Sequence, residues 1–108
     1  MSKLQWLGLA AASILALIET EAANAESGVV AYYKSGCDYY IVAASRGYAV
    51  LEWYGGDDPI EGDKLVGSIT YGMQTLVNLR TESETQAWVE EFMLSKESAV
   101  STYMEQCN

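Results

Sequence analysis

The first 25 residues have the pattern of an export signal, and this limits the folded part of the chain to 83 residues. Residues 1–3 give a positively charged start, and residues 7–18 are a twelve-residue run of Leu, Ile, Ala, Gly and one Ser. Residues 23–25 read Ala-Asn-Ala, the small-x-small pattern that a signal peptidase cleaves. We therefore predict that residues 1–25 are a cleaved signal peptide and that residues 26–108 form a single small domain.

A retained membrane anchor is the alternative interpretation of the same segment. The apolar run covers only residues 4–18, whereas a helix that crosses a bilayer needs about 20 apolar residues. Glu19 and Glu21 then end the run. We expect no stable membrane anchor after cleavage, and a periplasmic or secreted protein.

The mature chain contains two cysteines, Cys37 and Cys107. In an exported chain the expected state of such a pair is a disulfide. It would close a loop of about 70 residues. In the chain-entropy model such a disulfide stabilises the folded state by about 4 kcal/mol. The alternatives are a redox pair or metal ligands. The spacing is far from C-x-x-C, and two thiolates without a histidine supply only half of a zinc site.

The mature chain is strongly acidic, with five basic and thirteen acidic residues, a net charge of −8 and no histidine. Proteins bind nucleic acid chiefly by neutralising phosphates with Lys and Arg, so no nucleic-acid partner is expected. A cationic partner, such as a basic protein or a cell-envelope component, would be attracted over a long range. The alternative is that the charge only keeps a small exported protein soluble.

Period-two alternation predicts several short strands separated by glycine-rich turns. Two of these strands form a hairpin around the turn at residues 45–47, and the loop at residues 55–63 contains three glycines and the single proline. The piece at residues 29–33 is either an extra strand or a loose arm. The predicted strands are residues 38–44, 48–54, 64–70 and 74–81.

Residues 85–94 fit either a strand or a helix with a capping box at Ser83 and Gln86. We favour a strand, since a fifth strand helps to close the open edges of a sheet of four. Residues 95–107 then predict a helix with Ser95 as its N-cap. Its apolar stripe contains Ala99, Val100, Tyr103, Met104 and Cys107.

Together these elements predict a mainly β fold, a small five-stranded barrel at residues 38–94 with a C-terminal helix tied back by the disulfide. The short segment, its strand count and the Gly62-Asp63 start of its middle strand resemble those of small exported bacterial proteins with an SH3-like barrel and unassigned function. An OB-like barrel, or a four-stranded sheet with a longer helix, is the alternative. Proline-rich ligand recognition is not carried over, because the peptide-binding signatures of SH3 domains cannot be matched here.

The candidate binding site combines tyrosines with an acidic loop. Tyrosine anchors interfaces while tolerating water, and alternation puts two tyrosines on one exposed strand face beside the loop. We expect an exported, non-enzymatic binding module that uses this patch to engage a basic protein or envelope component. An alternative is that the tyrosines only fill the core. The candidate residues are Tyr48, Tyr54, Asp57, Asp58, Glu61 and Asp63.

Two other functions compete with the binding module. Four carboxylates within seven residues suggest a calcium-binding or purely structural envelope protein. However, Pro59 occupies the second ligand place of the calcium-loop pattern, so no metal ligand is assigned. A small hydrolase is the other alternative. It would need a histidine for a catalytic triad or a carboxyl group with a raised pKa, and no such pair is recognisable, so no catalytic residue or cofactor is expected.

Overall fold

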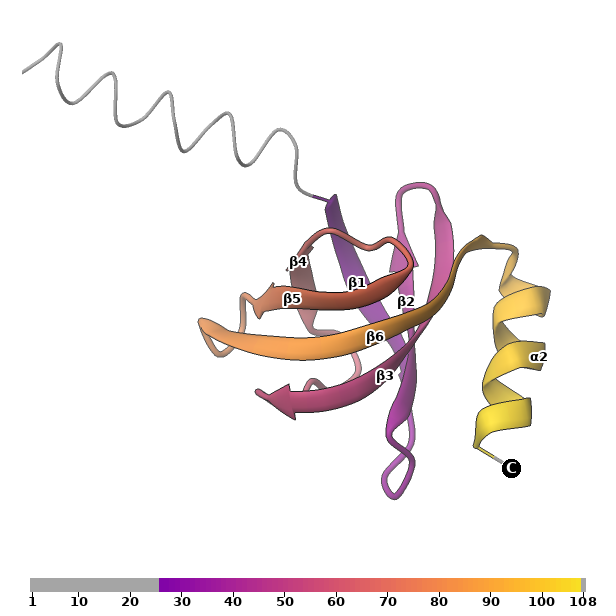
Figure 1. Cartoon of the computed structure of the whole chain (residues 1–108), viewed down its shortest axis with the longest axis horizontal. Helices are drawn as coiled ribbons and strands as arrows, with labels where there is room; N and C mark the ends of the chain where they lie inside the picture. Colours follow the sequence, from indigo (N-terminus) through magenta and orange to yellow (C-terminus); the bar gives the residue numbers. More distant parts are fainter. Residues whose placement is uncertain (1–25, 108) are drawn as a thin grey trace, which may run out of the picture.

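The computed structural model describes residues 26–107 and shows a small closed β-barrel with one helix beside it (Figure 1). The predicted signal peptide, residues 1–25, lies outside the described residues. The helix is α2 (Lys96–Gln106). The strands are β1 (Glu26–Tyr33), β2 (Tyr39–Ala44), β3 (Gly47–Gly56), β4 (Lys64–Gly67), β5 (Gly72–Asn78) and β6 (Ser83–Leu94).

The barrel has six strands, in the order β1-β2-β3-β6-β5-β4, so the prediction of five was wrong. The missing strand is β1, which pairs antiparallel with both β2 and β4 and closes the sheet. Its alternation is weak because one of its inward positions is Gly28, which is buried. A Cβ atom at Gly28 would collide with Cγ1 of Val42, so the barrel is too tight here for a side chain.

The other predicted strands are confirmed, with shorter bounds for two of them. β2 and β3 form the predicted hairpin, and Gly47 in its turn has a φ of 133°, which favours glycine. β4 and β5 end at Gly67 and Asn78, three residues earlier than predicted in each case. Residues 85–94 belong to strand β6, so the helical alternative and the four-stranded sheet are both wrong.

The interior of the barrel holds the main hydrophobic core. Alternate residues of each strand point inward, as period two requires. The barrel closes around them, so the sheet keeps no open edge between β1 and β4. The buried core residues are Val30, Tyr40, Val42, Ala49, Leu51, Leu65, Ile69, Leu76, Ala87 and Val89.

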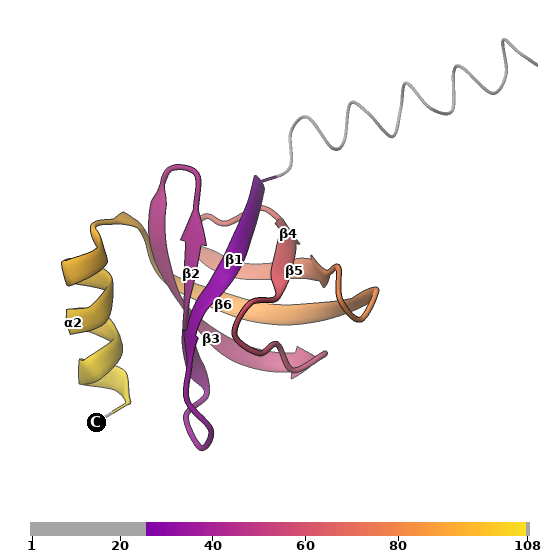
Figure 2. The same ribbon diagram turned by 180° about the vertical axis from the view of Figure 1, so that it is seen from behind.

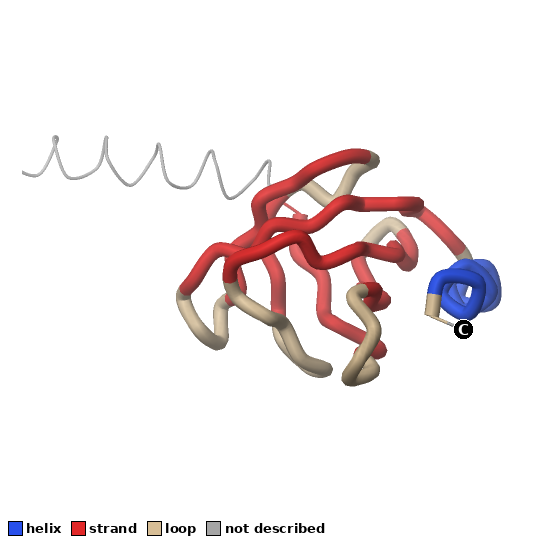
Figure 3. The backbone as a smooth tube through the Cα atoms, turned by 60° about the horizontal axis from the view of Figure 1, so that its bottom comes forward, coloured by secondary structure: helices blue, strands red, loops and turns tan. Residues whose placement is uncertain are grey.

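Helix α2 lies against the outer surface of the barrel, where it contacts β2, β3 and β6 (Figures 2 and 3). Its predicted N-cap is confirmed, because Ser95 Oγ accepts a hydrogen bond from the backbone N–H of Ser98 at 3.1 Å. Ala99 and Tyr103 are buried against Ile41 and Val50 in a second hydrophobic cluster. The helix thus covers a part of the sheet that would otherwise face solvent.

Candidate functional site

The acidic loop between β3 and β4 does not gather its carboxylates into one site. Asp63 is 3% exposed, and four donor groups from three residues occupy its oxygens. Arg80 Nε donates to Oδ1 at 2.6 Å, while Arg80 Nη2 and Asn78 Nδ2 donate to Oδ2 at 3.0 and 2.8 Å. The backbone N–H of Ile60 donates to the same oxygen at 2.9 Å. Asp63 is therefore a structural group.

Asp57 belongs to the same network through the amide of Asn78. Asn78 Nδ2 donates to Asp57 Oδ2 at 2.7 Å, and Asn78 Oδ1 accepts from the backbone N–H of Arg80 at 3.0 Å. Asn78 is fully buried, and all of its polar atoms have partners. We call Asp57, Asp63, Asn78 and Arg80 the loop network.

The ion pair in the loop network controls the charge of Asp63. The hydrogen bonds from Arg80 outweigh the opposing effect of burial and lower the pKa of Asp63 to about 2. The same contact raises the pKa of Arg80. Asp63 therefore stays ionised through the physiological pH range.

These contacts bear on the calcium alternative. A calcium ion at the loop would have to displace Arg80 and Asn78 from the oxygens of Asp63. Among residues 26–107, no three acidic, histidine or cysteine side chains stand close enough to hold a metal ion.

The structure separates the two tyrosines of the candidate site. Tyr54 is 55% exposed, but Tyr48 is half-buried and packs in the cluster beneath α2. The alternation along β3 was predicted correctly, whereas the covering of its outer face by the helix was not. The expected shared exposed face therefore does not form. The binding role of both tyrosines stays a prediction.

Asp58 and Glu61 remain exposed in the loop, and Asp58 lines a pocket that the sequence did not predict. This pocket has a volume of about 260 Å³. Two aromatic side chains and two carboxylates contribute to its walls. Its lining residues are Tyr33, Gly36, Cys37, Asp38, Trp53 and Asp58, which we call the aromatic–acidic pocket.

Hydrogen bonds fix Trp53 in the wall of this pocket. The backbone N–H of Trp53 donates to the carbonyl oxygen of Asp38 at 2.8 Å. Its indole Nε1–H donates to the carbonyl oxygen of Asp57 at 2.9 Å. The indole therefore has a fixed position relative to the turn before β2 and to the loop after β3, and these two segments supply the carboxylates of Asp38 and Asp58.

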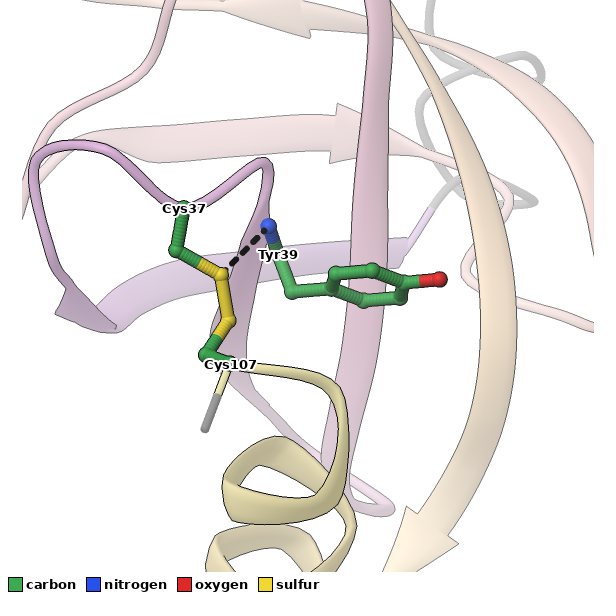
Figure 4. The surroundings of a disulfide bond; sticks show 3 residues. All are labelled: Cys37, Tyr39 and Cys107. Carbon is green, nitrogen blue, oxygen red and sulfur yellow. Dashed lines mark hydrogen bonds between the residues drawn. A yellow bond between two sulfur atoms is a disulfide. The ribbon is translucent and has the colours of Figure 1, made fainter.

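The predicted Cys37–Cys107 disulfide is confirmed, with a Cα–Cα distance of 5.8 Å (Figure 4). It joins the turn between β1 and β2 to the end of α2, and the backbone N–H of Tyr39 donates to Cys37 Sγ at 3.4 Å. Cys37 also lines the aromatic–acidic pocket, so the bond stabilises one of its walls. Such a disulfide in a small domain is compatible with a location outside the cytoplasm.

Tyr39 and Tyr40 stay protonated at neutral pH. Burial, with smaller contributions from Glu52 and other neighbours, raises the pKa of Tyr39 to about 12. Burial also raises the pKa of Tyr40, and the charges of Asp58 and Asp57 add to this effect. They can therefore act as hydrogen-bond donors, but not as phenolates.

Comparisons with known proteins return no relative. No family model, curated protein or solved structure matches the chain. The resemblance to small exported SH3-like barrels therefore stays a prediction. Within the described part of the chain, no helix has the length and apolar character needed to span a membrane.

Proposed function

We propose that residues 26–108 form an exported, non-enzymatic binding module that acts in the periplasm or as a secreted protein. Its partner is a basic protein or a cell-envelope component that presents a cationic group. The aromatic–acidic pocket receives this group. The observation that carries the proposal is the presence of two carboxylates and two aromatic side chains around one cavity.

The chemistry of the pocket suits an ammonium or guanidinium group. A cation over the face of Trp53 or Tyr33 is attracted by the ring quadrupole, more strongly when the cation is partly desolvated. Asp38 and Asp58 supply charge-assisted hydrogen bonds. The volume of about 260 Å³ lies just below the range typical of pockets for drug-sized molecules, which favours a single side chain or amine.

The net charge of the mature chain supports the same proposal over a longer range. A charge of −8 accelerates the approach of a basic partner, and this attraction weakens as salt screens it. Asp57 and Asp63 contribute to this field, although their oxygens are engaged in the loop network. Asp58 and Glu61 are exposed and free of that network.

The alternatives have less support. Calcium binding at the loop competes with the ion pair between Asp63 and Arg80. A hydrolase needs a carboxyl group whose pKa is raised, whereas the pKa of Asp63 is lowered.

The test is the affinity of the disulfide-bonded mature protein for a lysine octapeptide, measured by calorimetry at low and at physiological salt. We expect Asp38→Asn and Asp58→Asn each to weaken binding by about fivefold, the effect of one solvent-accessible ion pair. Glu105→Gln is the matched control, because it removes the same charge from an exposed position on α2. It should change the affinity less than twofold. Equal losses in all three variants would show that only net charge matters and would refute the pocket.

A further inference from the structure

A second cavity lies between α2 and the outer face of β1, β2 and β3. Its volume is about 300 Å³, at the lower end of the range for small-molecule sites. Helix α2 packs mainly on β2, β3 and β6, and it also reaches β1 through the contact between Tyr103 and Tyr32. We call this cavity the helix groove. Its lining residues are Ala31, Tyr32, Ile41, Tyr48, Lys96, Val100, Tyr103 and Met104.

The walls of the helix groove are apolar, and part of this surface is exposed. Tyr103 is buried and packs edge-to-face on Tyr32, with 5.1 Å between the ring centroids. Val100 and Met104, from the same helix stripe, are 44% and 57% exposed. The stripe predicted from the sequence is thus only half used for packing. The other half faces a cavity of fixed shape, because the disulfide holds the end of the helix.

Lys96 and the hydroxyl of Tyr103 are two polar groups of the lining that have no partner within residues 26–107. Lys96 is the single charged lining residue, and it forms no ion pair in this part of the chain. It is also the first residue of α2, where the helix dipole is positive. The hydroxyl of Tyr103 is buried and lacks a hydrogen-bond partner in the same range. A buried hydroxyl group in this state is costly. Tyr40, Thr81 and Thr85 have hydroxyl groups in the same state, so the Tyr103 hydroxyl does not by itself mark a ligand site.

We propose that the helix groove binds a small amphiphilic monocarboxylate, of the medium-chain fatty-acid type. The apolar chain lies against Ile41, Val100 and Met104. The carboxylate pairs with Lys96, the one cation available in a groove that otherwise offers only apolar and aromatic side chains. This site is separate from the aromatic–acidic pocket and does not depend on the function proposed above.

The first test is a titration of sodium octanoate into the isotopically labelled, disulfide-bonded protein, followed by NMR at the methyl groups. We expect saturable shifts at Val100 and Met104 and none at Met73, an exposed methionine on β5. Decanoate should bind more tightly and hexanoate more weakly, by about fourfold for each methylene group, since each contributes about 0.8 kcal/mol on burial. An absence of saturable shifts, or equal shifts at Met73, would overturn the proposal.

The second test separates the contribution of the ligand's carboxylate group from that of its alkyl chain. Lys96→Gln should weaken octanoate binding by about fivefold and leave the binding of octan-1-ol unchanged. Lys64→Gln is the matched control, because Lys64 is an exposed lysine on β4 outside the groove. Octan-1-ol binding as tightly as octanoate, or equal losses in the two lysine variants, would refute the pairing with Lys96. A dimer that octanoate dissociates in sedimentation measurements would show that a second copy of the chain fills the groove instead.

Discussion

At the scale of single residues, Asp63 shows how folding changes the role of a carboxylate. In the sequence it is one of four acidic residues in a polar loop, and nothing local distinguishes it from Asp58. In the fold it is buried and takes hydrogen bonds from Asn78 and Arg80, which follow it by 15 and 17 residues. The acidic composition of the loop could be predicted, but these partners could not, because they depend on the packing of β5 beside β4.

The ion pair predicts a specific dependence of stability on pH. The folded-state pKa of Asp63 is about 2, below its ordinary value of 3.8, so folding favours the ionised form. The resulting stabilisation is complete above about pH 4 and is lost as the pH falls through about 2. We expect Asp63→Asn to lower the free energy of unfolding by about 1–2 kcal/mol at neutral pH. This value is smaller than the pKa shift alone implies, because the Arg80 side chain is half exposed and solvent screens the ion pair. The free energy of unfolding of both proteins is measured by urea denaturation from neutral pH to about pH 2.

The control for this prediction is Asp58→Asn, which removes the same charge from an exposed position of the same loop. It should leave the stability almost unchanged at every pH. A constant difference between wild type and Asp63→Asn from neutral pH to pH 2 would contradict the assigned pKa.

At the scale of secondary-structure elements, β1 was the strand that sequence patterns described least well. The hairpin and α2 were predictable because large apolar residues recur at the right period and Ser95 marks the helix start. Residues 85–94 of β6 fit a strand or a helix, and the strand is favoured because it helps to close the sheet. The pattern of residues 29–33 fits either an extra strand or an arm, and Gly28, at the inward position just before them, adds no apolar side chain to that pattern. Where the barrel has no room for a side chain, a glycine takes the inward position. The sequence then lacks the apolar residue that would reveal a strand.

The closure of the barrel by β1 predicts that Gly28→Ala is destabilising. The added methyl group would overlap Val42 and approach Ile69 Cδ1 to 3.1 Å, so β1 or β2 would have to shift. We expect the free energy of unfolding to fall by about 1–3 kcal/mol, the usual cost of overpacking. Ser27→Ala, at the exposed neighbouring position, is the control and should have little effect. If Gly28→Ala were neutral by chemical denaturation, β1 would not be a tightly packed barrel strand.

At the scale of the whole molecule, the disulfide joins two units of the fold, the barrel and the helix. Its pairing was predictable because the chain has only two cysteines, which leave one choice. The aromatic–acidic pocket was not predictable, because its four aromatic and acidic residues come from four segments that alternation and loop composition treat separately. They are Tyr33, Asp38, Trp53 and Asp58. The helix groove could not be predicted either, because it depends on where α2 lies on the barrel.

This arrangement predicts different responses of the barrel and the helix when the disulfide is removed. The barrel is closed by its own strands, whereas α2 contacts only its outer face. We expect the double variant Cys37→Ser, Cys107→Ser to lose about 2–4 kcal/mol of stability. Amide exchange should accelerate throughout α2, while the amides of β3 and β6 remain protected. Equal loss of protection in the strands would show that the barrel depends on the helix.

The central claim, that the aromatic–acidic pocket receives a cationic group, is tested most directly by the indole N–H signals of the mature protein. Residues 26–108 contain two tryptophans, Trp53 in the pocket and Trp88 outside it. During a titration with the lysine octapeptide, we predict a saturable shift of the Trp53 signal that salt reverses, and a stationary Trp88 signal. A stationary Trp53 signal, or equal shifts of both signals, would contradict the claim.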